Sequence, residues 1–200
     1  DELCAVARSL GVTEADVRLG QRATEAEVRR MSKAGELARY RVLHFATHGA
    51  MSGEIAGGAE PGLIFTPPAK ASEEDDGYLA ASEIAQLRLN ADWVILSACN
   101  TGAGESAGAE ALSGIARSFF YAGARTLLVS HWAVNSQSTV RLITKAMAEI
   151  TRAEETRRPI ARAEAMRRSV VAMIDAGDPV EAHPAYWAPF VVVGEGAAVQ

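Results

Sequence analysis

The stretch from Trp93 to Gly108, WVILSACNTGAGESAG, constrains the fold of this chain more than any other. It begins as an uninterrupted apolar run and changes at Ser97 to small and polar residues that include three glycines. An apolar run bounded by glycines predicts a strand buried on both faces, and such strands occur mainly in parallel sheets. Open α/β sheets bind their ligands at the carboxyl ends of the strands, and Cys99 lies at that end of this one.

Length, charge and cysteine content limit the class of protein. The 200 residues are enough for one domain that buries roughly 70% of its unfolded surface in a single core. The two cysteines, Cys4 and Cys99, have neither metal-ligand nor disulfide spacing, which favours a reducing compartment such as the cytoplasm. A net charge of -5 argues against nonspecific nucleic-acid binding, and no apolar run approaches the roughly 20 residues of a membrane span. Because the chain opens on DELC rather than on Met, we expect residues 1–200 to be a single domain and the C-terminal fragment of a longer protein.

The hydrophobic pattern predicts helices that alternate with strands. The expected helices are Leu3–Leu10, Thr24–Lys33, Ser82–Leu87, Ala109–Tyr121, Ser136–Ile150 and Pro159–Ile174. The expected strands are Asp16–Leu19, Tyr40–Ala46, Gly62–Thr66, Gly77–Ala81, Asp92–Ala98, Arg125–Ser130 and Ala188–Val193. We expect Gly62–Thr66 to pair with Gly77–Ala81. This order predicts an α/β fold with a mostly parallel central sheet of about six strands and helices on both faces.

Polar residues follow three of these strands, and we expect them to converge on one sheet edge. Cys99 and His48 form a candidate nucleophile and acid/base pair there, because an imidazole favours the reactive thiolate and protonates a departing amine. The backbone N-H groups of Gly49 and Cys99 are the candidate oxyanion hole. The alternative is a half-buried cysteine and a histidine whose hydrogen bonds are satisfied within the fold.

Four segments together resemble the CHAT domain, a caspase-like cysteine protease family related to separase and often preceded by tetratricopeptide repeats. The segments are HFATHG at His44–Gly49, ILSACNTGAGE at Ile95–Glu105, GAEALSGIARSFFYAGARTLLVSHWAVNS at Gly108–Ser136, and AHPAYWAPFVVVGEG near the end. The resemblance implies a caspase-like three-layer sandwich, a His48/Cys99 dyad, and cleavage of a protein or peptide without metal or cofactor. It also implies a repeat region upstream.

One segment departs from the family pattern and bears on the substrate pocket. We expect the pocket at His131, Trp132, Asn135 and Ser136, although the first two equally suit a cover over the sheet edge. Separase-type relatives carry an acid in a WxVTD motif that receives a basic P1 side chain, whereas this chain has WAVNS. A neutral pair at Asn135 and Ser136 puts a basic P1 preference in doubt, and it supports a catalytically silent interaction module as the main alternative function.

Two other motifs suggest different chemistry. GESAG at Gly104–Gly108 matches the G-x-S-x-G nucleophile elbow of serine esterases, with Asp175 or Asp178 and then His183 in triad order. Its Ser106 lies well past the predicted strand, where an elbow serine must sit directly on the turn. His44 and His48 have the spacing of a helical zinc pair, but they fall at a strand end without the glutamate of that motif. We therefore expect no metal.

Overall fold

The computed structural model describes residues 2–54, 59–72, 74–97, 107–131, 135–175 and 179–194, with only the backbone described at Glu14 and residues 107–113. The chain divides into two compact units. Residues 18–133 form the unit that we call the sheet unit, and residues 1–17 together with 134–200 form the helical unit. Each is described by itself, and the expectation of one domain over residues 1–200 stays a prediction.

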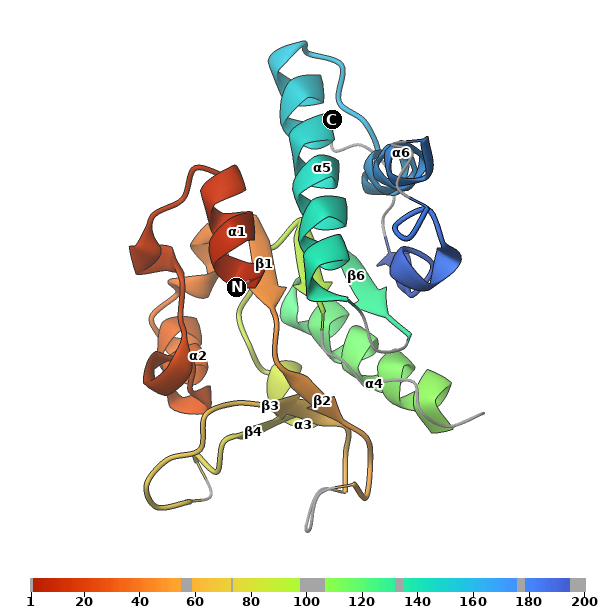
Figure 1. Cartoon of the computed structure of the whole chain (residues 1–200). Coiled ribbons are helices and arrows are strands. Elements are labelled where there is room, and N and C mark those ends of the chain that lie inside the picture. Colours follow the sequence, from red (N-terminus) through yellow and green to blue (C-terminus); the bar gives the residue numbers. More distant parts are fainter. Residues whose placement is uncertain are drawn as a thin grey trace. The chain divides into compact units, whose positions relative to one another are not determined.

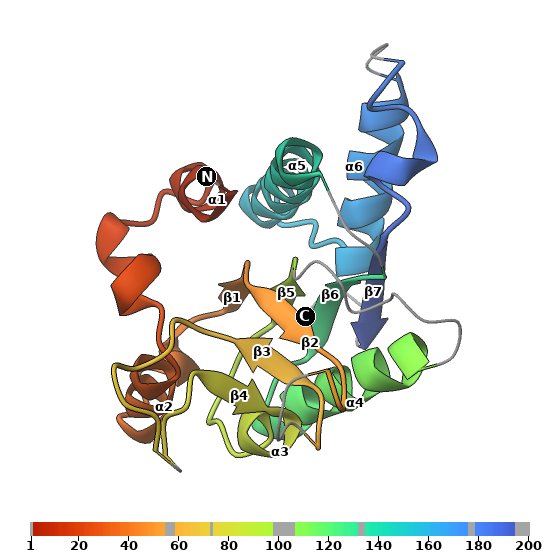
Figure 2. The same ribbon diagram turned by 60° about the horizontal axis from the view of Figure 1, so that its bottom comes forward.

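A parallel sheet lies at the centre of the sheet unit. Strand β5 (Trp93–Leu96) pairs in parallel with β1 (Val42–Phe45) on one side and with β6 (Thr126–Ser130) on the other (Figure 1; β5 is labelled in Figure 2). Every residue of β5 and β6 is buried, as a central strand of apolar residues requires. The α/β class and the parallel pairing of the central strand are therefore confirmed.

A second, antiparallel sheet holds the other strands of this unit. Strand β3 (Gly62–Ile64) pairs with both β2 (His48–Ala50) and β4 (Tyr78–Ala80) (Figure 2). The predicted pairing between the segments at Gly62 and Gly77 is confirmed, whereas β2 was not foreseen. A single parallel sheet of about six strands is not confirmed, because a parallel crossover needs a dozen or more residues, usually a helix, whereas these short strands pair as hairpins.

The helices of the sheet unit are η2 (Gly20–Arg22), α2 (Glu25–Lys33), η3 (Leu37–Arg39), α3 (Ala81–Ile84) and α4 (Ala107–Ala122). Helices α2 and α4 lie close to their predicted positions, α3 ends three residues before the predicted Leu87, and the short helices η2 and η3 were not predicted. The Thr24 hydroxyl accepts the N-H of Glu27 at 3.2 Å and caps α2 at the residue where this helix was predicted to begin. Helix α4 packs against α3 and β6 and ends at Gly123, whose φ of 108° suits glycine. A Cβ at Gly123 would also lie 2.5 Å from the carbonyl oxygen of Leu89.

Ion pairs hold together the amino ends of the three parallel strands. Asp92 precedes β5, has only 3% of its surface exposed, and pairs with Arg41 beside β1. Its other oxygen lies 2.8 Å from Nη1 of Arg125 beside β6. A buried carboxylate is tolerated when cations compensate its charge. These contacts join all three strands at this end.

The helical unit contains α1 (Glu2–Ser9), η1 (Glu14–Asp16), α5 (Ser136–Glu155), α6 (Arg162–Asp175), η4 (Pro184–Tyr186) and β7 (Phe190–Gly194). Helix α5 packs along α1 and along α6, and the buried Ser169 hydroxyl of α6 donates to the carbonyl of Leu142 at 2.7 Å. Helix α5 runs five residues past its predicted end at Ile150, and α6 begins three residues after Pro159. The three helices were otherwise predicted at these places.

Of two further strand predictions, Asp16–Leu19 was wrong and the last strand was confirmed. The segment Asp16–Leu19 is not a strand, because the Asp16 carboxylate accepts the backbone N-H and the hydroxyl of Thr13 at 3.3 and 2.9 Å. Such local side-chain bonds favour a turn over an extended strand. The last predicted strand is present as β7, and it is only partly buried, with 39% of Val191 exposed. Its apolar residues indicated a strand without showing how far it is covered.

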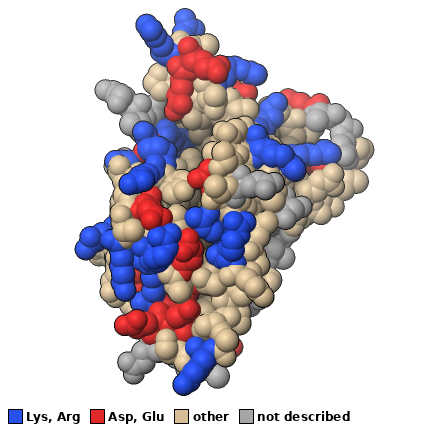
Figure 3. Space-filling model, turned by 90° about the vertical axis from the view of Figure 1, so that its left-hand side faces the viewer, with Lys and Arg blue, Asp and Glu red and all other residues tan. Residues whose placement is uncertain are grey.

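Charged side chains of both signs lie close to one another. On the face drawn in Figure 3, Lys and Arg side chains lie among Asp and Glu side chains. Separately, on α6 the Glu164 carboxylate accepts bonds from both Arg167 and Arg168. Within the described ranges, no helix combines the length and the apolar character that crossing a bilayer requires.

Candidate functional site

The carboxyl ends of β1 and β5 lie side by side in the sheet unit. Phe45 is in register with Leu96, and the N-H of Ser97 donates to the carbonyl of Phe45 at 3.2 Å. The chain segments that carry His48 and Cys99 therefore leave the sheet at the same edge. Cys99 follows Ser97 by two residues in the sequence and lies outside the described residues.

Aromatic packing and a short turn position His48. The Phe45 ring packs edge-on against Phe65 with centroids 6.3 Å apart, and it lies 5.5 Å from the ring of Phe119 in α4. After Phe45, the Thr47 hydroxyl donates to the carbonyl of Ile64, which ties this turn to β3. His48 then begins β2 opposite Ile64 with its side chain exposed. An exposed imidazole at this edge is accessible to a substrate.

Gly49, the other candidate for the oxyanion hole in this segment, lies inside the antiparallel sheet. It is buried and stands opposite Leu63 of β3. Because glycine has no side chain, nothing at this position shields its own backbone N-H group. Its role in binding an oxyanion stays a prediction.

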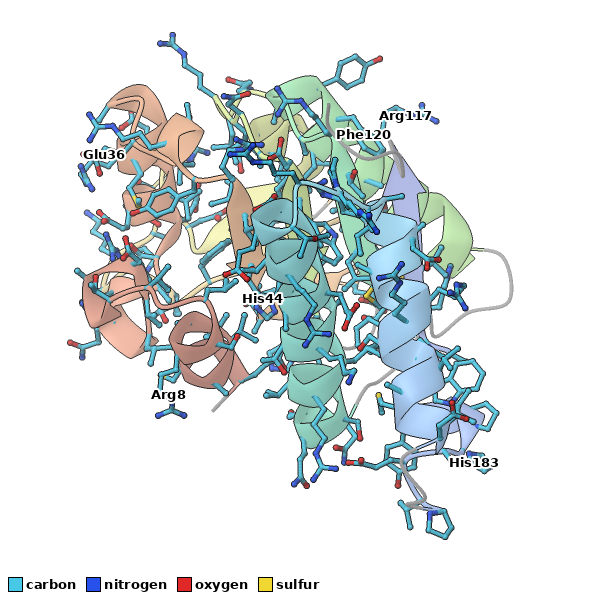
Figure 4. The ribbon with its side chains drawn as sticks, turned by 90° about the horizontal axis from the view of Figure 1, so that it is seen from above. Arg8, Glu36, His44, Arg117, Phe120 and His183 are labelled. Carbon is cyan, nitrogen blue, oxygen red and sulfur yellow. The ribbon has the colours of Figure 1, made fainter. Side chains whose placement is uncertain are left out.

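His44 and Ser97 form a contact that the sequence did not reveal. The Nε2 atom of His44 lies 2.9 Å from the hydroxyl oxygen of Ser97, within hydrogen-bond distance (His44 is labelled in Figure 4). In the parallel register His44 stands opposite Ile95, and the two side chains lie on the same face of the sheet. Ser97 follows Ile95 by two residues and therefore lies on that face as well, because side chains alternate between the faces along a strand. The signal in the sequence was a polar residue near the carboxyl end of each of two neighbouring strands.

The residues predicted to form the substrate pocket are divided between the units. His131 directly follows β6 in the sheet unit and is half-buried. Trp132 lies outside the described residues. Asn135 caps α5 in the helical unit, where its side-chain oxygen accepts the N-H groups of Gln137 and Ser138 at 3.0 and 3.1 Å, and Ser136 is the exposed first residue of the helix. A structural role thus already accounts for Asn135.

A comparison with known families shows which family this chain belongs to. A sequence model of the CHAT domain matches residues 1–195. The chain belongs to the CHAT-domain family. CHAT domains form a caspase-like family related to cysteine peptidases. No curated protein matches this CHAT domain significantly.

The serine-esterase alternative is weakened within this CHAT domain. Strand β5 ends at Leu96 and α4 begins at Ala107, so a long connection separates strand and helix where an elbow needs a tight turn. Ser106 itself lies outside the described residues. His183, the histidine of the supposed triad, accepts the N-H of Ala185 through Nδ1 at 3.2 Å. A triad histidine instead donates from Nδ1 to its carboxylate.

The described residues give no support to a zinc pair at His44 and His48. The two histidines lie on different strands, one half-buried beside Ser97 and the other exposed. No group of three or more His, Cys, Asp or Glu side chains able to hold a metal ion occurs among the residues described. The expectation of a reaction without metal or cofactor stays a prediction.

Proposed function

We propose that this CHAT domain is a cysteine endopeptidase in which His48 and Cys99 form the catalytic dyad. The observation that carries the proposal is the in-register parallel pairing of β1 with β5, closed at its end by the bond from Ser97 N-H to the Phe45 carbonyl. It makes the segments that bear the two residues start from adjacent points of the same sheet edge. Membership of a peptidase-related family supports the same chemistry.

The proposed reaction begins with attack of the Cys99 thiolate on the scissile carbonyl carbon. A C-S bond forms, and the negative charge moves to the carbonyl oxygen, which the N-H groups of Gly49 and Cys99 stabilise. When the C-N bond breaks, the His48 imidazolium donates its proton to the departing amine. Water then hydrolyses the acyl thioester, which releases the carboxylic acid and restores the thiol.

The finer features of the proposal come from the family. We place the substrate among proteins or peptides, the chain in the cytoplasm, a repeat region upstream, and the fold in the caspase-like three-layer class. His131 and Trp132 are the proposed substrate contacts beside β6. We propose neither a nucleic acid nor a membrane as a binding partner.

A peptide-library cleavage assay tests the proposed function. We expect cleavage by the wild-type chain and its loss, by a factor of about 10³ or more, in both Cys99→Ala and His48→Ala, because each removes a group that the reaction needs. The matched control is Cys4→Ala in α1, which removes the other thiol and leaves cleavage unchanged. Mass spectrometry after iodoacetamide treatment should find Cys99 alkylated.

The alternative functions give different results in the same experiment. A silent interaction module cleaves nothing, and its Cys99→Ala variant behaves as the wild type does. A serine esterase keeps its activity without Cys99 and is labelled at Ser106 by a fluorophosphonate. Either result contradicts the endopeptidase proposal.

A further inference from the structure

His44 and Ser97 join the two strand ends from which the proposed dyad segments start. His44 is the third residue of β1 and Ser97 directly follows β5, and their side chains meet at 2.9 Å. Ser97 is only 6% exposed. A hydrogen bond at a buried position holds its partners more firmly than one in water, because water does not compete for either group.

The contact between His44 and Ser97 lies at the end of the parallel strands from which the proposed dyad segments start. At the opposite end of the same strands, Asp92 pairs with Arg41 and Arg125. The parallel strands are thus joined by side chains at both ends, by ion pairs at the amino ends and by the His44 and Ser97 bond at the carboxyl ends. Of these two sets of contacts, the bond between His44 and Ser97 lies at the strand ends that lead to His48 and Cys99.

We propose that His44 is a positioning residue, which through its hydrogen bond to Ser97 sets the geometry from which the thiol of Cys99 reacts. This inference rests on the proposed function. Reaction rates depend on holding the reacting groups to within a fraction of an ångström, and a misplacement of about 1 Å costs as much as 10²-fold. A bond that ends two residues before Cys99 in the sequence is suited to that task.

The role differs from two ordinary alternatives. If His44 serves packing alone, it needs its ring but neither ring nitrogen. If Ser97 only stabilises the fold, its removal lowers the free energy of unfolding without changing the rate per folded molecule. The experiment therefore removes the bond while keeping the ring, and then restores the bond with a different group.

The full chain is tested in four single variants and one double variant. His44→Phe keeps the ring without nitrogens, Ser97→Ala removes the hydroxyl, His44→Gln places an amide near Nε2, and Ser97→Thr retains the hydroxyl. We expect His44→Phe and Ser97→Ala each to lower kcat about tenfold with KM unchanged, which corresponds to about 1.4 kcal/mol. Because the two substitutions remove the same bond, kcat of the double variant should fall no further than kcat of either single variant. His44→Gln and Ser97→Thr should recover to within about threefold of the wild type.

The second readout is the alkylation rate of Cys99 with iodoacetamide, divided by the rate of Cys4 in the same molecule. It needs no peptide cleavage, and we expect it to fall in His44→Phe and Ser97→Ala and to recover in the conservative variants. The matched control is Ser169→Ala, which removes another buried serine bond, to the Leu142 carbonyl, in the helical unit. It should lower the melting temperature while leaving kcat and the alkylation ratio unchanged.

The outcomes separate the two proposals. A wild-type chain that cleaves nothing contradicts the proposed function alone. An unchanged alkylation ratio in folded Ser97→Ala contradicts the positioning role, and so does a loss in Ser97→Thr equal to that in Ser97→Ala. If His44→Phe fails to fold, the comparison of Ser97→Ala with Ser97→Thr decides.

Discussion

Glu25 shows how a single buried carboxylate organises the loop before β4. It lies in the first turn of α2 with 1% of its surface exposed, and its Oε2 atom accepts the backbone N-H groups of Asp76 and Gly77, each at 3.0 Å. Its other oxygen lies 2.7 Å from Nε of Arg29. Gly77 has a φ of 83°, and a Cβ there would lie 2.8 Å from Cα of Pro67, so that this close approach requires glycine.

Burial raises the pKa of Glu25 above its ordinary value of 4.5, although the two backbone bonds and Arg29 oppose the shift. The unfolded chain therefore loses this proton at a lower pH than the folded chain does. The free energy of unfolding should then fall as pH rises from 4.5 through the raised pKa. We expect Glu25→Gln to lack this fall, as measured by urea unfolding at several pH values.

Glu27, two residues further along α2, provides the control of opposite sign. Hydrogen bonds from Arg30 and then Arg18 lower the pKa of Glu27 below 4.5. Its contribution to stability is present above pH 4.5 and is lost as pH falls through the lowered pKa. Glu27→Gln should therefore lessen the loss of stability in acid. Identical pH profiles for the wild type and Glu25→Gln would contradict the role given to Glu25.

At the level of secondary-structure elements, α5 depends on a residue that the sequence suggested for substrate binding. The Asn135 side chain accepts two of the N-H groups that the first turn of a helix leaves without partners. Because its oxygen is engaged in this way, the second-to-last position of WAVNS has a structural explanation. The helix it caps runs for twenty residues and packs along both α1 and α6.

We expect Asn135→Ala to lower the free energy of unfolding by about 1 kcal/mol, the usual cost of losing an N-cap. Asn135→Asp should leave it unchanged, since a carboxylate caps equally well and suits the positive end of the helix dipole. Ser136→Ala, at the exposed neighbouring position, is the matched control without a cap to lose. Urea unfolding measures all three, and an Asn135→Ala variant as stable as the wild type would show that the cap contributes little.

Strong local sequence patterns predicted whole helices and strands, but they did not predict contacts between residues far apart in the sequence. The apolar runs at Trp93 and Thr126 and the cap at Thr24 led to β5, β6 and α2, because burial and capping leave local traces in a sequence. Strand β2 is three residues long and too short to show a period. Helix α2 is rich in charged residues, and nothing local indicated that Glu25 is buried by contacts with backbone groups 51 and 52 residues away. The His44 and Ser97 contact likewise depends on strand register.

For the whole molecule, burial is uneven along the described chain. Trp93, Val94, Ile95, Leu127, Leu128 and Val129 are at most 1% exposed. By contrast, α1 has one buried residue, and β7 is half exposed. Stability follows such differences, because segments with few buried contacts open locally without the rest unfolding. The strand that leads toward Cys99 is therefore expected to stay closed while others open.

Hydrogen exchange followed by mass spectrometry tests this distribution. Peptides covering β5 and β6 should exchange slowest, at the rate of global unfolding, because their amides open only when the core does. Peptides from α1 and β7 should exchange earlier, through local opening. Adding low urea should speed exchange in β5 and β6 more steeply than in α1, since global unfolding exposes the larger surface. If β5 exchanged as fast as α1, the sheet would not be the stable centre, and the positioning proposed for His44 would lose its rigid support.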